Sequence, residues 1–260
     1  MAPLPPLILL PPSEGKAPGG DGPPLDWHGG RFGALGDARL EVREAVRHHL
    51  AQQGTAGRLL GVRGAHLERA LAEWRHLDHA PTLPADARYT GVVWGALGLQ
   101  SLAPGVRRRA SSRIVVPSGL WGLVGASDAI PAYRLKMGAR VAPLGLLAAW
   151  WRPRVSDALR GAGRGRYVVD LLPEEHRAAI DPAVLPAGRY VRVDIVDDGP
   201  GGRRAVGHAG KALKGALARA LIEGDARTAD DVASAAADGL VLAAVEHGDT
   251  TQVVFRRDGG

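Results

Sequence analysis

The sequence predicts a single compact α/β domain over residues 1–260, with a mixed β-sheet flanked by helices. Three observations lead to this fold class. Short apolar runs rich in β-branched residues occur among segments of helical periodicity, without the strict alternation of a purely parallel fold. No internal repeat and no long linker divides the chain. Apolar residues make up 45% and charged residues 23%, as in globular proteins with a buried core.

The N-terminal half follows two patterns. Apolar runs that end at proline or glycine predict buried strands, and apolar residues spaced three and four apart predict helices. A loop rich in glycine and proline separates the first strand from the first helix. In chain order, these patterns give a strand over residues 7–10, a helix over 37–53 with Asp37 as N-cap, a helix over 64–77, a segment over 89–97 that fits either element, and a strand over 113–116.

The C-terminal half mixes helices and strands and closes with a hairpin, in which the turn His247-Gly248-Asp249 joins two strands. Thr228 has the position of an N-cap for a short helix. In chain order, the predicted elements are a helix over residues 144–159, strands over 167–171 and 190–196, helices over 211–223 and after Thr228, and the hairpin strands over 240–245 and 251–256.

Composition limits the classes of function. The chain has no cysteine, which excludes disulfides, thiolate catalysis and zinc or iron–sulfur sites built on cysteine. A net charge of +6 and a pI near 10.1 fit a polyanionic or phosphorylated partner, or the composition of an arginine-rich genome. Neither a signal peptide nor a membrane span is recognisable, so we expect a cytoplasmic protein without a membrane partner.

Lysine is used sparingly. Of 33 basic residues, lysine supplies only Lys16, Lys136, Lys211 and Lys214, and each lies within two residues of a glycine. Lysine is a titratable point charge, whereas arginine is a permanently charged fork. A chain that otherwise uses arginine is therefore expected to keep lysine where that difference matters. The alternative is chance among few residues.

Two of these lysines lie in segments with the ingredients of an anion site. Residues 9–16 (LLPPSEGK) place Ser13, Glu14 and Lys16 directly after a strand, although the spacing is not that of an ATP-binding P-loop, and a solvated loop is the alternative. In residues 118–138, an extended segment would direct Arg134 and Lys136 to the same face. A ligand phosphate or the carboxylate of Asp128 would hold these two cations together.

The other two lysines open a predicted helix. His208, Lys211 and Lys214 recur every three residues and share one helix face. Cations in the first turn oppose the helix dipole, and an anion bound at the helix N-terminus would compensate for that. An ordinary solvated face is the alternative.

Residues 59–71 (LLGVRGAHLERAL) predict a helical hairpin whose turn contains Gly61, Arg63 and Gly64. It is similar to a helix-hairpin-helix element, in which turn amides and the second helix hold a DNA phosphate. The glycines are three apart rather than two, so an ordinary helical hairpin is the alternative. The histidine pairs lack a third ligand at metal-binding spacing, so no metal site and no cofactor is predicted.

Seven motifs in order resemble the YaaA family of bacterial peroxide stress proteins. They cover nearly the whole chain, whose alanine- and arginine-rich composition is similar to that of actinobacterial members. The block at residues 118–138 is the most specific. The motifs are LLPPSEGK at 9–16, ARYTGVVWGAL at 87–97, SGLWGLVGASDAIPAYRLKMG at 118–138, the tryptophan helix at 148–159, YVVDLLPEEH at 167–176, GKALKG at 210–215 and VVFRR at 253–257.

This resemblance implies a mixed α/β fold with a basic cleft and a helix-hairpin-helix-like element near residues 57–77. It also implies non-specific binding of duplex DNA and a role in limiting oxidative DNA damage and free iron under hydrogen peroxide stress. No cofactor is established by it. On this hypothesis, the DNA- or anion-binding residues are Ser13, Lys16, Gly61, Arg63, Gly64, Arg134, Lys136, His208, Lys211 and Lys214.

The alternative hypothesis is an enzyme that acts on a small anionic or nucleotide-like substrate in a pocket lined by lysines. Both hypotheses require that folding brings lysine amines from distant segments into one recess. Glu14 and Tyr133 would then transfer protons. The candidate catalytic residues are Glu14, Lys16, Tyr133, Lys136, Lys211 and Lys214.

Overall fold

The computed structural model describes residues 4–52, 54–199, 202–205, 208–235 and 237–257, with the backbone alone for residues 197–199, 202–205 and 208. Within these residues, the main element is an eight-stranded sheet in the order β11-β12-β9-β8-β1-β3-β4, with β10 paired to β9. The strands are β1 (Leu7–Leu9), β3 (Ile114–Ser118), β4 (Gly122–Gly125), β8 (Val168–Asp170), β9 (Tyr190–Gly199), β10 (Gly202–Ala205), β11 (Leu240–Glu246) and β12 (Thr250–Arg257).

The sheet is mixed in a regular way. The five central strands β12, β9, β8, β1 and β3 pair in parallel, while β11, β4 and β10 pair antiparallel at its margins. Two small antiparallel pairs lie outside it, β2 (Leu83–Pro84) with β5 (Ala129–Ile130) and β6 (Arg140–Val141) with β7 (Gly145–Leu146).

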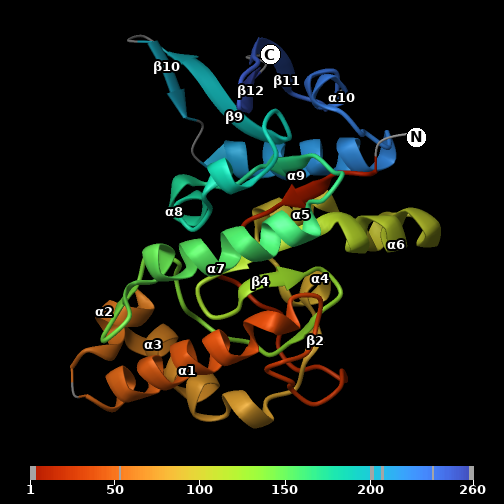
Figure 1. Ribbon diagram of the computed structural model, residues 1–260. Helices are drawn as coiled ribbons and strands as arrows, with labels where there is room; N and C mark the ends of the chain where they lie inside the picture. The colour runs from red at the N-terminus through yellow and green to blue at the C-terminus, as the bar shows by residue number, and fades with distance from the viewer. Residues whose placement is uncertain (1–3, 53, 200–201, 206–207, 236, 258–260) are drawn as a thin grey trace.

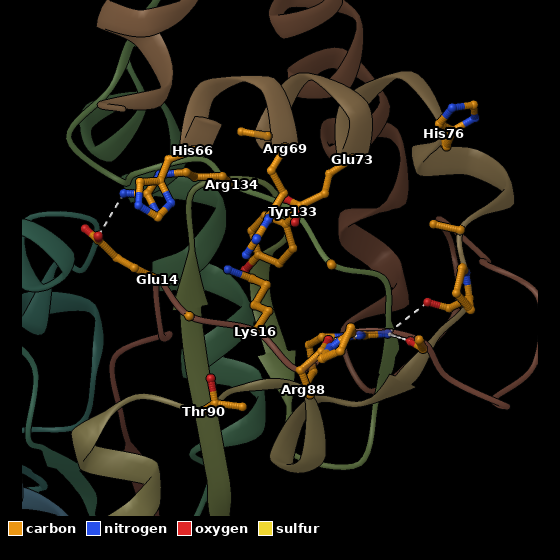
Figure 2. Close-up of a pocket in the computed structure, with 18 residues that line it drawn as sticks. Glu14, Lys16, His66, Arg69, Glu73, His76, Arg88, Thr90, Tyr133 and Arg134 are labelled. Atoms are coloured by element: carbon orange, nitrogen blue, oxygen red, sulfur yellow. Dashed lines mark hydrogen bonds and ion pairs between the residues drawn. The ribbon is translucent and has the colours of Figure 1, made fainter. Parts of the chain in front are cut away.

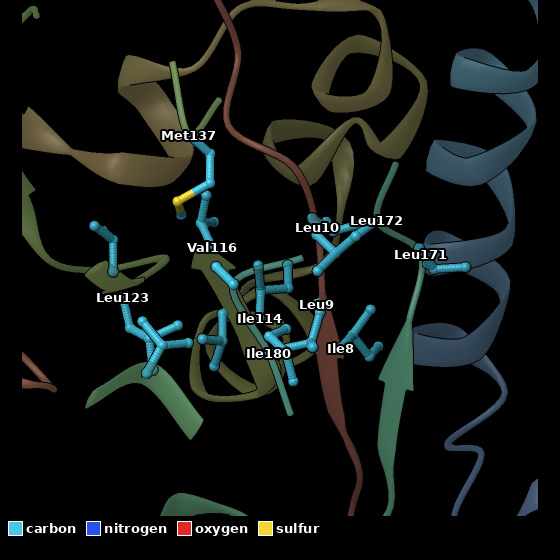
Figure 3. Close-up of a cluster of buried hydrophobic side chains, with 14 of the residues drawn as sticks. Ile8, Leu9, Leu10, Ile114, Val116, Leu123, Met137, Leu171, Leu172 and Ile180 are labelled. Atoms are coloured by element: carbon cyan, nitrogen blue, oxygen red, sulfur yellow. The ribbon is translucent and has the colours of Figure 1, made fainter. Parts of the chain in front are cut away.

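The centre of the sheet is the hydrophobic core. Ile8, Ile114 and Val169 have no exposed surface, and Figure 3 shows the side chains of β1 and β3 packed together with those that follow β8. A parallel strand covered on both faces is apolar at every position. The apolar runs at residues 7–10 and 113–116 therefore predicted these two buried strands correctly.

Helices pack around the sheet and gather at two ends of the molecule. Helices α1 to α3 lie together at one end, α9 and α10 lie with β9 to β12 at the other, and α7 runs between them (Figure 1). The helices are α1 (Gly36–Ala51), α2 (Ala56–Leu60), α3 (Gly64–Arg75), α4 (Ala85–Arg88), α5 (Val92–Leu97), α6 (Pro104–Arg113), α7 (Leu147–Ala162), α8 (Glu174–Arg177), α9 (His208–Glu223) and α10 (Ala229–Ala233), with 3₁₀ turns at Gly33–Leu35, Leu77–His79, Leu99–Ser101 and Pro182–Val184.

The predicted fold class is confirmed, and three predicted helix starts are corrected. Helix α7 begins at Leu147 rather than at residue 144, and α9 begins at His208 rather than at residue 211. Leu35, not Asp37, is the N-cap of α1; Asp37 lies in the first turn, where its carboxylate is 2.9 Å from His28 Nε2. Residues 89–97 contain helix α5, which begins only at Val92. Thr228 is confirmed as the N-cap of α10, because its hydroxyl and the Asp231 carboxylate cap each other's backbone amides.

The parallel strands end at a common edge, where the polar loops meet. β1 leads into Ser13 and Lys16, β3 into Gly119, and β8 into Leu172 and Glu175. In an open sheet with parallel strands, ligands bind outside the carboxyl ends of the strands. The motifs that the sequence singles out at residues 9–16, 118–138 and 167–176 therefore converge at this edge.

Candidate functional site

The loop that carries Lys16 is held in place by a buried arginine. Lys16 forms an isolated antiparallel bridge with Tyr89, and the amide of Ala17 donates to the Arg88 carbonyl at 2.9 Å. The Arg88 side chain is fully buried and donates to the carbonyls of Ala17, Gly19 (2.8 Å), Pro81 (2.8 Å) and Ile130 (3.1 Å). One guanidinium thus ties together three segments that are distant in the sequence.

The Lys16 amine is half-buried and has few partners. Its Nζ donates to the Ser13 carbonyl at 2.9 Å and lies 4.2 Å from the centroid of the Tyr133 ring. Burial lowers the pKa of Lys16 to about 7; the charge of Arg134 acts in the same direction, while Glu73 and Glu14 oppose it. Near neutral pH, a large fraction of this amine is therefore uncharged and has a free lone pair.

Tyr133 is a rigid wall beside this amine. Its hydroxyl lies 2.7 Å from Ser118 Oγ and 2.9 Å from the Tyr89 hydroxyl, and all three groups are buried. Burial raises the pKa of Tyr133 to about 12. The phenol therefore stays neutral near pH 7, and its hydroxyl is engaged in this chain rather than directed at a ligand.

Lys16 faces a cavity of about 800 Å³ between the 14–19 loop and helix α3. Figure 2 shows Lys16, Tyr133 and Glu73 directed into the same space, with His76 turned away from it. Burial raises the pKa of the Glu73 carboxyl. The charged or titratable side chains that line the cavity are Glu14, Lys16, His66, Arg69, Glu73, His76, Arg88, Tyr133 and Arg134.

Glu14 connects Lys136 to this site. The prediction that Asp128 lies between Arg134 and Lys136 is wrong. Residues 131–137 alternate between buried and more exposed, so Arg134 and Lys136 do share a face. The carboxylate between them is Glu14, 2.8 Å from Arg134 Nη2 and 3.5 Å from Lys136 Nζ. Asp128 instead accepts from the amides of Gly125 (2.8 Å) and Arg31 (3.0 Å), and so shapes a turn.

The ion pairs also affect Glu14 itself. Although burial opposes it, the hydrogen bond and charge of Arg134, with the charge of Lys136, lower the pKa of the Glu14 carboxyl. Glu14 is therefore ionised near neutral pH and serves as a counter-ion there. A role for Glu14 as a proton donor, which the sequence suggested, would first require that these pairs open.

The helical hairpin lies directly against the same cations. Arg134 Nε donates to the Leu60 carbonyl at 3.0 Å, and the Trp74 indole donates to the Arg134 carbonyl at 2.9 Å. Gly61 has a left-handed φ of 65° and is so close to Lys136 that a Cβ there would lie 3.3 Å from Lys136 Nζ. The hairpin is thus a helical hairpin anchored to the 133–136 segment; its role as a DNA-binding element stays a prediction.

The remaining lysines lie elsewhere. Lys214 Nζ donates to the Leu172 carbonyl at 3.1 Å, and burial, together with the charge of Arg177, lowers its pKa. Lys211 is exposed on α9, and the His208 side chain lies outside the described residues. Packing explains the glycine at position 215, because a Cβ there would clash with the Val93 carbonyl where α9 crosses α5. Of the four lysines, Lys16 and Lys136 lie near each other, because both line a smaller cavity together with Glu14.

Several site residues were not singled out from the sequence. Arg88 and Tyr89 lie in the ARYTG motif, but their roles depend on carbonyls and hydroxyls from other segments. His66, Arg69 and Glu73 follow one another at helical spacing on α3, and that periodicity marks a polar face. Glu175 accepts from the Gly138 amide at 2.8 Å, and buried His176 Nδ1 has no hydrogen-bond partner among the described residues.

Neither a metal site nor a membrane-spanning helix is found among the described residues. No group of three or more histidine, aspartate or glutamate side chains there could hold a metal ion. Among the helices in those ranges, none combines the length and apolar composition needed to cross a membrane.

Comparisons with known proteins give a consistent result. The profile of a family described as "Peroxide stress protein YaaA" matches residues 7–245. A UPF0246 protein of Streptomyces coelicolor is 37% identical over 222 residues, which is 83% of this chain and 82% of that protein. A UPF0246 protein of Corynebacterium glutamicum is 36% identical over 254 residues, 91% and 94% of the two chains. One from Methylibium petroleiphilum is 31% identical over 226 residues, 78% and 87%.

Proposed function

The chain belongs to the YaaA family of peroxide stress proteins. We propose that it binds duplex DNA without sequence preference, through the α2–α3 hairpin and Lys136. Binding of this kind would limit oxidative damage to the DNA. The observation that carries the proposal is the position of the hairpin turn against Lys136, because the two together offer a phosphate both amides and charge.

The turn is suited to a phosphate backbone. Gly61, Arg63 and Gly64 are exposed, and the 12-residue helix α3 begins at Gly64, so the free amides of its first turn are accessible. The side chain of Lys136 is 43% exposed beside Gly61. Arg58 adds a further exposed cation on α2. These groups contact phosphates in many DNA-binding proteins and carry no information about base sequence.

The test is a salt titration of binding to a fluorescent DNA duplex, measured by anisotropy. Each phosphate contact releases counterions, so the log–log slope of affinity against salt falls by about 0.9 per contact. Arg63→Gln and Lys136→Gln are each expected to weaken binding and to reduce this slope by about 1. Lys211→Gln is the matched control, because it removes the same charge from α9, at the other end of the molecule (Figure 1).

Three outcomes would overturn the DNA-binding proposal. One is an affinity that does not change between low and moderate salt. Another is a Lys211→Gln variant that weakens binding as much as the hairpin variants do. The third is binding that survives in a variant lacking both Arg63 and Lys136.

A second function is favoured by a different observation, the half-buried Lys16 amine in its own cavity. A duplex cannot enter a space of about 800 Å³, whereas a small anion or nucleotide-sized molecule can. We therefore propose that this cavity binds a small anionic substrate. Lys16→Arg is expected to abolish protection of cells against hydrogen peroxide while DNA affinity changes less than about twofold. Full protection by Lys16→Arg would contradict this second function.

A further inference from the structure

The Lys16 amine has one hydrogen-bond acceptor among the described residues and faces a cavity. A charged ammonium has three donors. Within the described part of the chain, Nζ of Lys16 donates one hydrogen bond, to the Ser13 carbonyl, and otherwise faces the Tyr133 ring and the cavity. The neutral form of the amine needs no further acceptors and presents its lone pair. This arrangement fits a nucleophile better than a buried counter-ion.

The cavity also contains a cation that the fold does not use. Arg69 lines the wall on α3, and no described residue forms a hydrogen bond or ion pair with its guanidinium, although its charge acts on Glu73. Arg134 and Arg88, by contrast, are occupied by Glu14 and by backbone carbonyls. A guanidinium left free beside a concave surface is suited to a phosphate or a carboxylate.

We propose that Lys16 forms a reversible imine with an aldehyde or ketone that carries a phosphate or carboxylate, and that Arg69 binds this anionic group. This inference rests on the second function proposed above, a small-anion site in the Lys16 cavity, and it names the substrate class. Lysine amines react with carbonyl groups in this way when they are uncharged and shielded from water.

The step balances without an oxidant or a reductant. The lone pair of neutral Nζ adds to the carbonyl carbon, a C–N bond forms, and the carbonyl π electrons move to oxygen. A proton then moves from nitrogen to that oxygen. The carbinolamine loses this oxygen as water, with a second proton from the Glu73 carboxyl, and the nitrogen lone pair forms the C=N bond of the iminium. Glu73 is left as the carboxylate that faces it.

The burial of Glu73 fits this role. Burial raises the pKa of the Glu73 carboxyl, which favours the protonated form that donates this proton. The stacked Tyr133 ring limits the directions from which a carbonyl can approach Nζ. The indicated approach is from the side of α3, where Arg69 and Glu73 lie.

The first experiment uses pyridoxal 5′-phosphate, an aldehyde with a phosphate, followed by borohydride reduction and peptide mass spectrometry. The chain has only four lysines, so the labelling of Lys16 can be compared with that of the other three in the same sample. We expect Lys16 to be labelled at least about tenfold faster than exposed Lys211 at pH 7, because a large fraction of the Lys16 amine is neutral and Arg69 lies beside it to bind the phosphate. Equal labelling of the four lysines, or none at Lys16, would overturn the inference.

Variants separate the two parts of the proposal. Arg69→Gln is expected to slow labelling of Lys16 by pyridoxal 5′-phosphate and to leave labelling by pyridoxal, which lacks the phosphate, unchanged. Lys16→Arg is expected to remove the fast labelling, and Lys211→Arg to retain it. If Arg69→Gln slows both reagents equally, the assignment of Arg69 as the anion-binding residue is wrong.

A competitor distinguishes failure of this inference from failure of the cavity function. Pyridoxine 5′-phosphate has the phosphate and no carbonyl, so it is expected to bind and to protect Lys16 from pyridoxal 5′-phosphate. Binding of this competitor without any imine at Lys16 would leave the small-anion site standing and reject the imine. Absence of both would reject the two together.

A phosphate-bearing aldehyde can be a small metabolite or the opened sugar of an abasic site in DNA, which can enter the cavity only when it is turned out of the duplex. A second arm therefore mixes the protein with a duplex oligonucleotide that contains one abasic site and reduces the mixture with borohydride. A covalent complex through Lys16 would identify DNA as the source, and labelling by the small aldehyde alone would identify a metabolite. Trapping through Lys136 or Lys211 in place of Lys16 contradicts the proposal.

Discussion

Two polar regions lie at the carboxyl ends of neighbouring parallel strands, and they differ in how completely their charges are paired. Each contains a lysine whose pKa is lowered by burial, Lys16 after β1 and Lys214 beside β8. At β8, fully buried Asp170 accepts from the Tyr190 hydroxyl at 2.6 Å, the Leu172 amide at 2.7 Å and the Arg177 guanidinium. In the Lys16 cavity, no described residue forms a hydrogen bond or ion pair with the side chain of Glu73 or of Arg69.

This difference separates structural from functional charge. A buried charge with all its partners stabilises the fold only while every partner is present, since the loss of one leaves the others uncompensated. Charges that lack partners inside the protein are available to a ligand. Lys16 and Lys214 each donate to one carbonyl, so the difference lies in the charges around them. The carboxylate of Asp170 is fully paired, which marks the β8 network as structural, whereas the side chains of Glu73 and Arg69 are unpaired among the described residues, which marks the Lys16 cavity as the candidate site.

The largest expected effect is at Asp170. Asp170→Ala leaves the Arg177 guanidinium and the Tyr190 hydroxyl without their buried acceptor, and we expect a loss of about 3–5 kcal/mol in the free energy of unfolding. Urea denaturation measures this loss. Glu73→Ala is the matched change in the cavity and is expected to cost less than about 1 kcal/mol. Similar costs at both positions would remove the distinction between the two regions.

Arg88, which holds the loop beside the cavity, should contribute to stability as the β8 network does, unlike the side chains that line the cavity. Arg88→Lys keeps the charge but cannot reach the four carbonyls that the guanidinium contacts, so we expect about 2–3 kcal/mol of destabilisation. Hydrogen exchange should also rise at the amides of Ala17 and Thr90, which pair with this segment. Unchanged exchange in the 13–19 loop would show that Arg88 does not hold the loop.

The pH dependence of stability sharpens the contrast at Lys16. Because the pKa of Lys16 falls to about 7 on folding, the unfolded chain binds a proton that the folded chain lacks between about pH 7 and 10. The stability of the native protein relative to Lys16→Met should therefore rise with pH in this window, by up to about 1 kcal/mol per pH unit. Lys211→Met is the reference, and an equal rise there would contradict the assignment.

The smallest expected effect is at Arg69. Arg69→Gln removes an exposed guanidinium that no described residue pairs with, so the free energy of unfolding should change by less than about 0.5 kcal/mol. Binding of pyridoxine 5′-phosphate, measured by calorimetry, should nevertheless weaken severalfold. A clear loss of stability would place Arg69 among the structural charges instead.

Local patterns predicted most of the fold. Residues 7–10 and 114–116 are apolar at every position because parallel strands at the centre of a sheet are covered on both faces. The alternation of residues 131–137 correctly placed Arg134 and Lys136 on one face. The helix start at Asp37 was wrong because Leu35 ends a 3₁₀ turn that continues into α1, and this preceding turn has no signature in the local sequence.

The sequence alone determined the fold class, the family and the few lysines, because periodicity, motif order and composition are properties of the chain itself. The tertiary structure decided which charges meet. Glu14 rather than Asp128 lies between Arg134 and Lys136, and Arg88 reaches carbonyls from three segments. It also left Lys211 and Lys214 away from the Lys16 cavity. Ion pairs form between residues that the fold brings within a few ångströms, and separation along the chain carries no record of that distance.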